Sequence, residues 1–240
     1  MTHPTDPYRL DAVESLTQGW RALSANLVPW VVGLLIYLLV TVGLTLLVVM
    51  PIALQDTPGE EDSVALSPAT VAALILVYTV LFVLGVIWTL NLYRNAVRQV
   101  QGEHVRVRDF FRVDGLGIPF VAYLLMTVLT IAGLLLFIVP GIVVAVFLMY
   151  VPYLVFSRPE AGIVAVFRGS VDIVRNNPGA TLLLVLFSLL LGAVGSLTVI
   201  GVFITTPLAA CLLAHATLKG SGDRYAYGAE DRAASARPGE

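Results

Sequence analysis

The chain has 240 residues, of which 58% are hydrophobic and only 12% are charged. A soluble domain carries roughly 25% charged residues, so this composition excludes an ordinary soluble globular protein and is typical of a chain dissolved in lipid. The formal net charge of -2 indicates no nucleic-acid partner, and the single cysteine, Cys211, excludes a disulfide framework within one chain.

The polar lead before the first apolar run predicts an amphipathic helix within residues 1–26, which we assign to a cytoplasmic N-terminal segment. Asp11 and Glu14 have the spacing of a capping box, in which two side chains satisfy the free backbone amides at a helix start. Trp20 and Arg21 are candidate interfacial residues. The predicted apolar face consists of Val13, Leu16, Trp20 and Leu23.

Uncharged runs mark the membrane spans, because an Asp or Arg at mid-bilayer costs about 3 kcal/mol. A bilayer core needs roughly 20 helical residues per crossing. Two runs of that length predict spans at about 27–50 and 68–92, which open a six-span membrane domain over residues 27–218.

No charged residue lies between Asp114 and Arg158, a stretch that would be about 64 Å long as one helix, twice the thickness of the hydrocarbon core. We expect a reversal at Pro140–Gly141, because proline disfavours a helical residue before it and glycine tolerates a positive φ. The resulting spans are at about 117–139 and 142–156. In the second of them, Tyr150 and Tyr153 are candidate cavity residues.

Another uncharged stretch of double length predicts spans at about 179–197 and 201–218, with a turn between them. Two half-length re-entrant helices remain an alternative there. Pro207 predicts a kink in the last span, because proline removes one backbone hydrogen bond. The polar residues 219–240 predict a disordered cytoplasmic tail.

The basic residues give the orientation. With these spans, every Lys and Arg falls on one side of the membrane, whereas the loop on the other side, around 51–67, carries acidic residues and no basic one. The positive-inside rule then places both termini in the cytoplasm, and we expect a bacterial plasma-membrane protein.

Basic and aromatic residues also precede the third and fifth spans on the cytoplasmic side. They predict contact with anionic lipid headgroups, although setting the topology would alone account for the basic ones. The candidate headgroup or interfacial residues in these two regions are Arg94, Arg98, Phe110, Phe111, Arg112, Phe167, Arg168 and Arg175.

Each predicted hairpin therefore follows a leading segment that lies at the membrane surface. The third leading segment, "SRPEAGIVAVFRGSVDIVRNNPG", has Ser157 and Glu160 at capping-box spacing, and like the first it ends on Asn shortly before Pro. This recurrence indicates a structural pseudo-repeat. The alternative is that any helix entering a membrane needs an amphipathic lead.

The segments "TQGWRALSANL", "FIVPGIVVAVFLMYVPYLVF", "AVFRGSVDIVRNN" and "VIGVFITTPLAACLLAHATL" occur in this order. In them the chain resembles bacterial integral membrane proteins related to the membrane domain that is fused to some glycerophosphoryl diester phosphodiesterases. The resemblance implies a helical membrane domain of unassigned role. It carries over no catalytic residue, because the hydrolytic chemistry of the fused proteins belongs to a separate soluble domain.

No catalytic, cofactor-binding or metal-binding residue is predicted. Cys211 and His215 share a helical face but lack a third ligand, and no ionisable residue lies well inside a span, as coupled transport usually requires. We expect a non-enzymatic structural, accessory or interacting membrane component whose partners are membrane lipids, with a protein partner or a second copy as further options. The alternative function is a transporter or facilitator for a small or lipid-like solute.

Overall fold

A computed structural model describes residues 9–53, 67–223 and 225. These residues form α-helices and one short 3-10 helix, with no strand among them, which confirms the predicted all-α fold. In chain order the elements are α1 (Ala12–Ala25), α2 (Val28–Ala53), α3 (Pro68–Val100), η1 (Val107–Phe111), α4 (Gly117–Leu136), α5 (Ile138–Leu148), α6 (Val151–Ser157), α7 (Ile163–Asn176), α8 (Pro178–Ser196) and α9 (Val199–Ser221).

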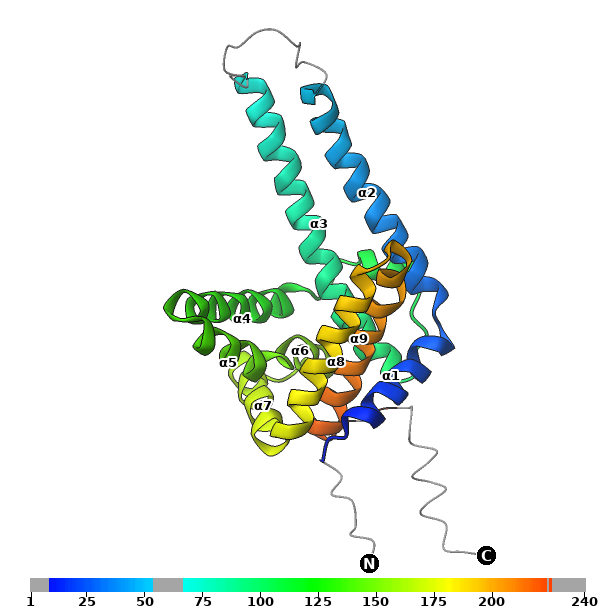
Figure 1. Ribbon diagram of the computed structural model, residues 1–240, viewed down its shortest axis with the longest axis vertical. Coiled ribbons are helices and arrows are strands. Elements are labelled where there is room, and N and C mark those ends of the chain that lie inside the picture. The colour runs from blue at the N-terminus through cyan, green and yellow to red at the C-terminus, as the bar shows by residue number, and fades with distance from the viewer. Residues whose placement is uncertain (1–8, 54–66, 224, 226–240) are drawn as a thin grey trace, which may run out of the picture.

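The helices are arranged as three hairpins around a packed base. Figure 1 shows the α2–α3 hairpin extending away from the other helices, while α4 runs across that direction and projects to one side. We call the packed region the base: it comprises α1, η1, α6, α7 and the C-terminal parts of α3 and α9. Six segments within the described part of the chain are long and apolar enough to cross a membrane, in agreement with the predicted number of spans.

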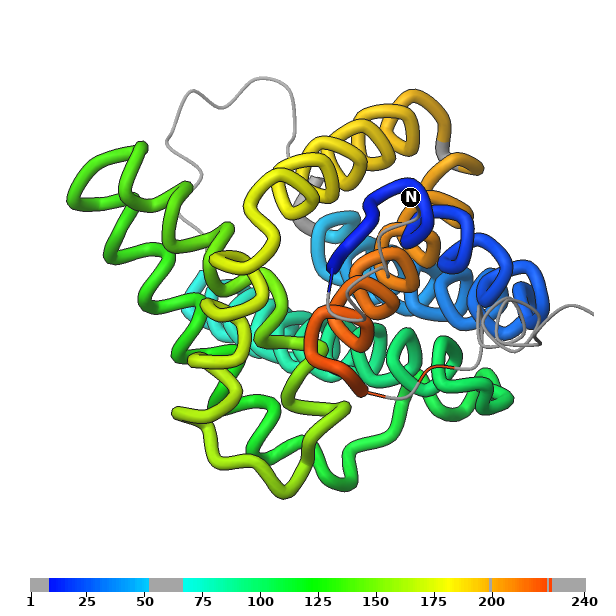
Figure 2. Tube along the Cα trace, turned by 90° about the horizontal axis from the view of Figure 1, so that it is seen from below, coloured from blue at the N-terminus to red at the C-terminus, as the bar shows by residue number. Residues whose placement is uncertain are grey.

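The C-terminal half of α9 is the centre of the base. Helices α1, α3 and α8 pack around it, and α1 lies directly against it when the protein is viewed from below (Figure 2). The contact between α1 and α9 is very close, because a Cβ atom added at Gly19 would lie 2.8 Å from the backbone nitrogen of Leu212. The buried α9 side chains are Ala210, Cys211, Leu212, Ala214, His215, Ala216, Thr217 and Leu218.

This close approach changes the predicted face of α1. The face turned to α9 carries mainly small or polar residues, which are Ala12, Ser15, Gln18, Gly19, Ala22 and Leu23. Of the predicted apolar face, only Leu23 is fully buried, whereas Val13 and Trp20 are exposed. Exposure of Val13 and Trp20 is compatible with the predicted contact of this face with the membrane. What the sequence did not predict is the second face, because the distance between the two backbones admits small side chains there.

The N-cap of α1 is as predicted, but the rest of its capping box is not seen. The Asp11 carboxylate accepts hydrogen bonds from the amides of Val13 and Glu14. Glu14 instead forms an ion pair with Lys219 at the end of α9. The second predicted capping box is wrong, since Ser157 ends α6 and α7 starts after Gly162.

Two of the three leading segments end in the same way, which supports the pseudo-repeat. Helices α1 and α7 both have 14 residues, and their C-caps Asn26 and Asn177 adopt similar backbone angles, φ -153°, ψ 58° and φ -135°, ψ 54°. Each Asn side chain also bonds to a distant backbone: Asn26 donates to the carbonyl of Val105, and Asn177 accepts from the amide of Leu10. The second leading segment differs, because it contains the short η1.

The α4–α5 hairpin turns earlier than predicted. The reversal is at Phe137, which is extended, while Pro140 and Gly141 lie in the first turn of α5. Proline is tolerated there because an amide in the first turn has no intrahelical partner. Gly141 does not take a positive φ. It is needed for a different reason, because a Cβ atom there would lie 2.6 Å from the backbone nitrogen of Leu134.

The last two predicted spans agree more closely with the structure. Helices α8 and α9 meet at a short turn where the Thr198 hydroxyl accepts a hydrogen bond from the amide of Gly201. Pro207 lies inside α9, which is assigned as one helix through it. The helix continues to Ser221, so the first residues of the predicted tail 219–240 are helical, and most of that tail and the predicted loop 51–67 lie outside the described residues.

We predict that Gly19→Ala destabilises the protein, because the added methyl group collides with the α9 backbone and such overpacking costs about 1–3 kcal/mol. The measurement is the midpoint of thermal unfolding in mild detergent. Gly43→Ala in α2 is the matched control, since a Cβ atom there meets nothing within 4 Å. Equal midpoints for the two variants would contradict the close crossing of α1 and α9.

Candidate lipid-headgroup site

The connection between α3 and α4 is held by an aromatic side chain that points into the base. Phe110 of η1 is fully buried, and its ring lies 5.0 Å from that of Trp30 and 5.1 Å from that of Trp88, measured between centroids. Gly33 of α2 leaves room for it, since a Cβ atom there would lie 3.1 Å from the ring. Phe110 is therefore not the membrane anchor that the sequence predicted. Phe111, at 38% exposure, remains partly on the surface.

Hydrogen bonds fix the backbone of the same connection. The Asn91 side chain on α3 donates to the carbonyl of Arg112 over 2.7 Å. The Asp109 carboxylate accepts from the amide of Arg106 over 2.9 Å and closes the start of η1. Arg112 is thus presented at a defined place beside α3.

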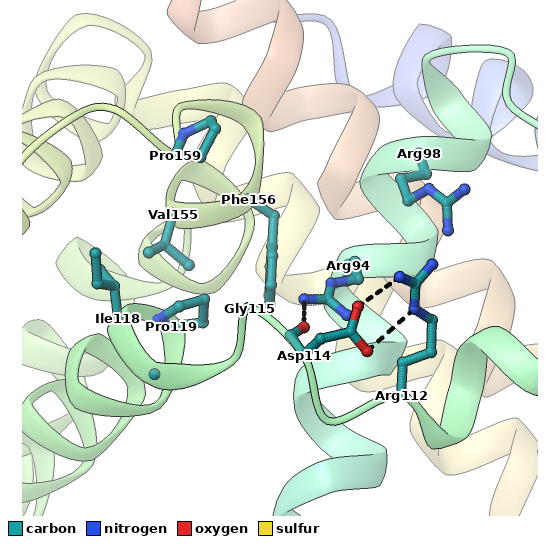
Figure 3. Close-up of a pocket in the computed structure, with 11 residues that line it drawn as sticks. Arg94, Arg98, Arg112, Asp114, Gly115, Ile118, Pro119, Val155, Phe156 and Pro159 are labelled. Carbon is teal, nitrogen blue, oxygen red and sulfur yellow. Dashed lines mark hydrogen bonds and ion pairs between the residues drawn. The ribbon is translucent and has the colours of Figure 1, made fainter.

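This arrangement creates a groove of about 650 Å³ between the end of α3, the start of α4 and α6. One wall carries Arg94, Arg98 and Arg112 together with Asp114, as Figure 3 shows. The opposite wall is apolar and consists of Ile118, Pro119, Val155, Phe156 and Pro159. The structure therefore brings together the three arginines that the sequence identified as candidates.

Arg98 and Arg112 share the Asp109 carboxylate, at 3.7 Å and 3.9 Å, and each guanidinium of the three also has a partner of its own. Arg112 forms an ion pair with Asp114, and Arg98 forms one with Glu103 at 2.7 Å. Arg94 donates to two uncharged oxygens, the side-chain oxygen of Asn91 and the backbone carbonyl of Asp114. Its guanidinium also lies 5.5 Å from the centre of the Phe156 ring, in a cation–π contact.

The ion pair between Arg112 and Asp114 favours the charged form of both groups. The hydrogen bond from Arg112 lowers the pKa of the Asp114 carboxyl and, in return, raises the pKa of the Arg112 guanidinium. Both groups are exposed, so an incoming anion can replace Asp114 as the partner of Arg112. Three positive charges and one negative charge line the groove, and Glu103 and Asp109 pair with Arg98 and Arg112 from outside its lining. Arg94, which bonds to uncharged oxygens, is therefore the main attraction for an anionic ligand.

A second groove gathers the candidates of the third leading segment. It has a volume of about 560 Å³ and contains Phe167, Arg168 and Arg175 of α7 together with Asp172. Apolar residues of α4, α5 and α7 form the rest of its lining. The two sets of predicted residues therefore lie in separate grooves.

The remaining candidates do not join either groove. Trp20 is exposed at 47% on the outer face of α1, and Arg21 is exposed beside it. Tyr150 and Tyr153 are buried in the base: the Tyr150 hydroxyl lies 3.2 Å from that of Thr181, and the Tyr153 ring packs edge-on against Tyr93. The two tyrosines have structural contacts of their own.

Several residues of the first groove were missed as site residues. Asp114 was counted only as a charge, and Phe156 only as part of an apolar run. Asn91 was visible as a polar residue in an apolar helix, which is a usable signal. The apolar wall had no signal, because it forms only when α6 packs against the start of α4.

The apolar surfaces beyond the base are large. Leu47, Phe82 and Leu135 are between 68% and 83% exposed, and such residues cover the outer parts of all the long hairpin helices. Surfaces of this kind require hydrocarbon as solvent. Together with six helices of spanning length, they make this chain a multi-pass helical membrane protein.

The chain is similar to an uncharacterized protein of Mycobacterium bovis and to two uncharacterized proteins of Mycobacterium tuberculosis. Each is 27% identical over 222 residues, which cover 87% of this chain and 68% of the relative. No family model and no solved structure matches the chain. The similarity therefore extends over most of the chain.

We predict that Phe110→Ala loosens the α3–α4 connection, because removing a buried phenylalanine ring costs about 3–5 kcal/mol. Phe111→Ala, which removes the partly exposed neighbour, should have a much smaller effect. Thermal unfolding in detergent and trypsin cleavage after Arg106 and Arg108 report the change. Equal effects of the two substitutions would mean that Phe110 is not the buried contact.

Proposed function

We propose that this chain is a non-enzymatic protein of a bacterial plasma membrane that binds anionic phospholipid headgroups in the groove between α3, α4 and α6. The observation that carries this proposal is the pairing of one arginine wall with one apolar wall at the inner ends of membrane helices. A phospholipid presents a negative phosphate beside apolar chains, so both walls find a partner in it.

The distribution of charge supports a cytoplasmic position for the groove. Arg94, Arg98 and Arg112 lie at the end of α3 that joins the base, and Arg158 and Lys219 lie at the base as well. Basic residues near the ends of spans are enriched on the cytoplasmic side. With the base in the cytoplasm, the groove opens beside the inner leaflet, which carries the anionic lipids.

The apolar wall favours a lipid over a soluble anion. Ile118 at the start of α4 is 54% exposed, and the exposed apolar surface continues from it along α4. Inorganic phosphate would satisfy the arginines but would make no contact with this apolar surface. A lipid covers both, and burying the apolar part adds roughly 25 cal/mol per Å².

The chemistry of the groove supports binding without catalysis. Its lining offers guanidinium groups, one carboxylate and apolar side chains. The carboxylate of Asp114 is engaged by Arg112, so it is a poor general base. The resemblance noted in the sequence agrees with this view, because in the fused proteins a separate soluble domain, and not the membrane domain, carries the hydrolytic activity.

One observation favours the alternative of a facilitator. A cavity of about 220 Å³ lies between α3, α6, α8 and α9, and hydroxyl-bearing residues line part of it, namely Tyr153, Ser188, Thr205 and Thr206. Solute flux into liposomes that contain the purified protein tests this alternative, with protein-free liposomes as the control. Its outcome does not depend on the arginine groove.

We predict that Arg94→Gln weakens binding of phosphatidylglycerol by about fivefold, since one basic residue near an anionic leaflet contributes about that factor. Arg112→Gln should act in the same direction, and Asp114→Asn should strengthen binding, because it removes the competing carboxylate. Titration of the detergent-solubilised protein with fluorescent phosphatidylglycerol gives the affinities. Binding should weaken as salt is added, because exposed charges are screened.

Arg108→Gln is the matched control, because Arg108 lies in the same connection but outside the groove. Phosphatidylcholine tests the need for negative charge, and inorganic phosphate as competitor tests the need for the apolar part. Equal losses for Arg94→Gln and Arg108→Gln would contradict the assignment of the groove. Full competition by millimolar phosphate would contradict a lipid ligand.

A further inference from the structure

The turn of the α4–α5 hairpin is apolar and exposed at the same time. Leu135, Phe137, Ile138 and Val139 are each at least 70% exposed, and no polar side chain occurs from 131 to 149. The α8–α9 turn, by contrast, contains Ser196 and Thr198. Turns that face water usually contain polar residues or glycine. The α4–α5 turn therefore has the composition of a segment surrounded by hydrocarbon.

The helix that returns from the turn is too short to cross a bilayer, although α4, with 20 residues, is itself long enough. Leu125, in the middle of α4, and Leu148, at the end of α5, line the same groove as the charged residues of α7. Beyond Leu125, α4 extends about 16 Å to its end, and the 11 residues of α5 also extend about 16 Å. The hydrocarbon core is about 30 Å thick. Beyond Leu125, the hairpin therefore covers little more than half of it.

The continuation of α5 does not lengthen the hairpin. After a break at Met149 and Tyr150 the chain enters α6, which is buried in the base. The break is anchored to α7, because the Ser170 hydroxyl donates to the carbonyl of Phe147 over 2.7 Å and the amide of Tyr150 lies 3.3 Å from the same oxygen. These hydrogen bonds hold the C-terminal end of α5 against α7.

The α2–α3 hairpin is different. From Pro68 to Asn91, α3 is about 36 Å long, which is enough for a full crossing. Figure 1 shows α2 and α3 extending together away from the base, whereas α4 runs across their direction and projects to one side. The α4–α5 turn therefore does not lie beside the far ends of α2 and α3.

The turn is built to reduce the cost of backbone groups in hydrocarbon. Pro140 has no amide hydrogen, so the first turn of α5 exposes one donor fewer. The amide of Phe137 bonds to the carbonyl of Gly133, and the carbonyl of Phe137 accepts from the amide of Gly141. The close packing of Gly133 on Gly141 keeps these groups together.

From this we propose that the α4–α5 hairpin is re-entrant: it enters the membrane from the side of the base and turns back within the hydrocarbon core. Its tip, residues 134 to 139, contacts acyl chains and does not reach the opposite aqueous phase. Composition argues against an interfacial position, because the exposed residues of α4 are apolar, while Tyr123, Thr127 and Thr130 are half-buried, so that α4 has no polar face for water. A re-entrant hairpin and a pair of full crossings both return the chain to the side from which it entered. The proposal therefore leaves the predicted position of both termini on one side unchanged.

Cysteine accessibility in the full-length protein tests this proposal. Cys211→Ala removes the native thiol, and single cysteines replace Ile138 at the tip, Ser67 at the outer end of α3 and His104 in the α3–α4 connection. A membrane-impermeant maleimide is applied to intact cells and to inside-out vesicles. We expect labelling of position 67 from one side and position 104 from the other. We expect labelling of position 138 from neither side until detergent is added.

Labelling of position 138 from the same side as position 67 would show a full crossing and overturn the proposal. Labelling from the same side as position 104 would show a hairpin outside the bilayer, with the same consequence. Leu136→Cys is a second tip variant in case Ile138→Cys does not assemble. Quenching of a bimane on position 138 by nitroxide lipids gives the depth, with strongest quenching expected from labels near the bilayer centre and not near the headgroups.

Discussion

The close crossing of α1 over the C-terminal half of α9 is the constraint on which the base depends. At Gly19 the two backbones are in contact, so α1 can bury only small or polar residues there. The pair is extended by a hydrogen bond between Ser15 and His215 and by the ion pair between Glu14 and Lys219. Once α1 is seated, the carbonyl of Ala22 accepts from Gln99 of α3, whose side-chain oxygen accepts from the Trp30 indole of α2. One buried amide therefore joins the first three helices.

The groove between α3, α4 and α6 depends on the same scaffold. Trp30 and Trp88, which position Phe110, belong to α2 and α3, and these helices are held in place by Gln99. The arginines of the groove are partnered before any ligand arrives, and exposed ion pairs of this kind are weak. A phosphate would exchange one acceptor for another without uncovering a buried charge. Such a site favours exchangeable lipids over a permanently bound one.

The sequence predicts the elements well and their contacts poorly. Charge-free runs locate the six apolar segments, and the Asn-to-Pro pattern locates the ends of α1 and α7, because both signals are local. The buried face of α1, the burial of Phe110 and the turn at Phe137 depend on which backbone lies opposite. Gly19 and Gly141 illustrate this: the sequence marks them as glycines, and only the neighbouring α9 and α4 explain why no other residue fits. The arginines were predictable as a group, but the apolar wall across from them was not.

The pairing of the first and last helices also has a consequence for biosynthesis. Ser15 and His215 are 200 residues apart in the chain. At a translation rate of about 5–20 residues per second, the ribosome needs about 10–40 s to make the partner of α1 after α1 itself has emerged. Val13 and Trp20 remain exposed in the folded protein. During that interval they can bind the nascent helix to the membrane surface. Helix α1 can therefore pack into its final position only after α9 has been synthesised.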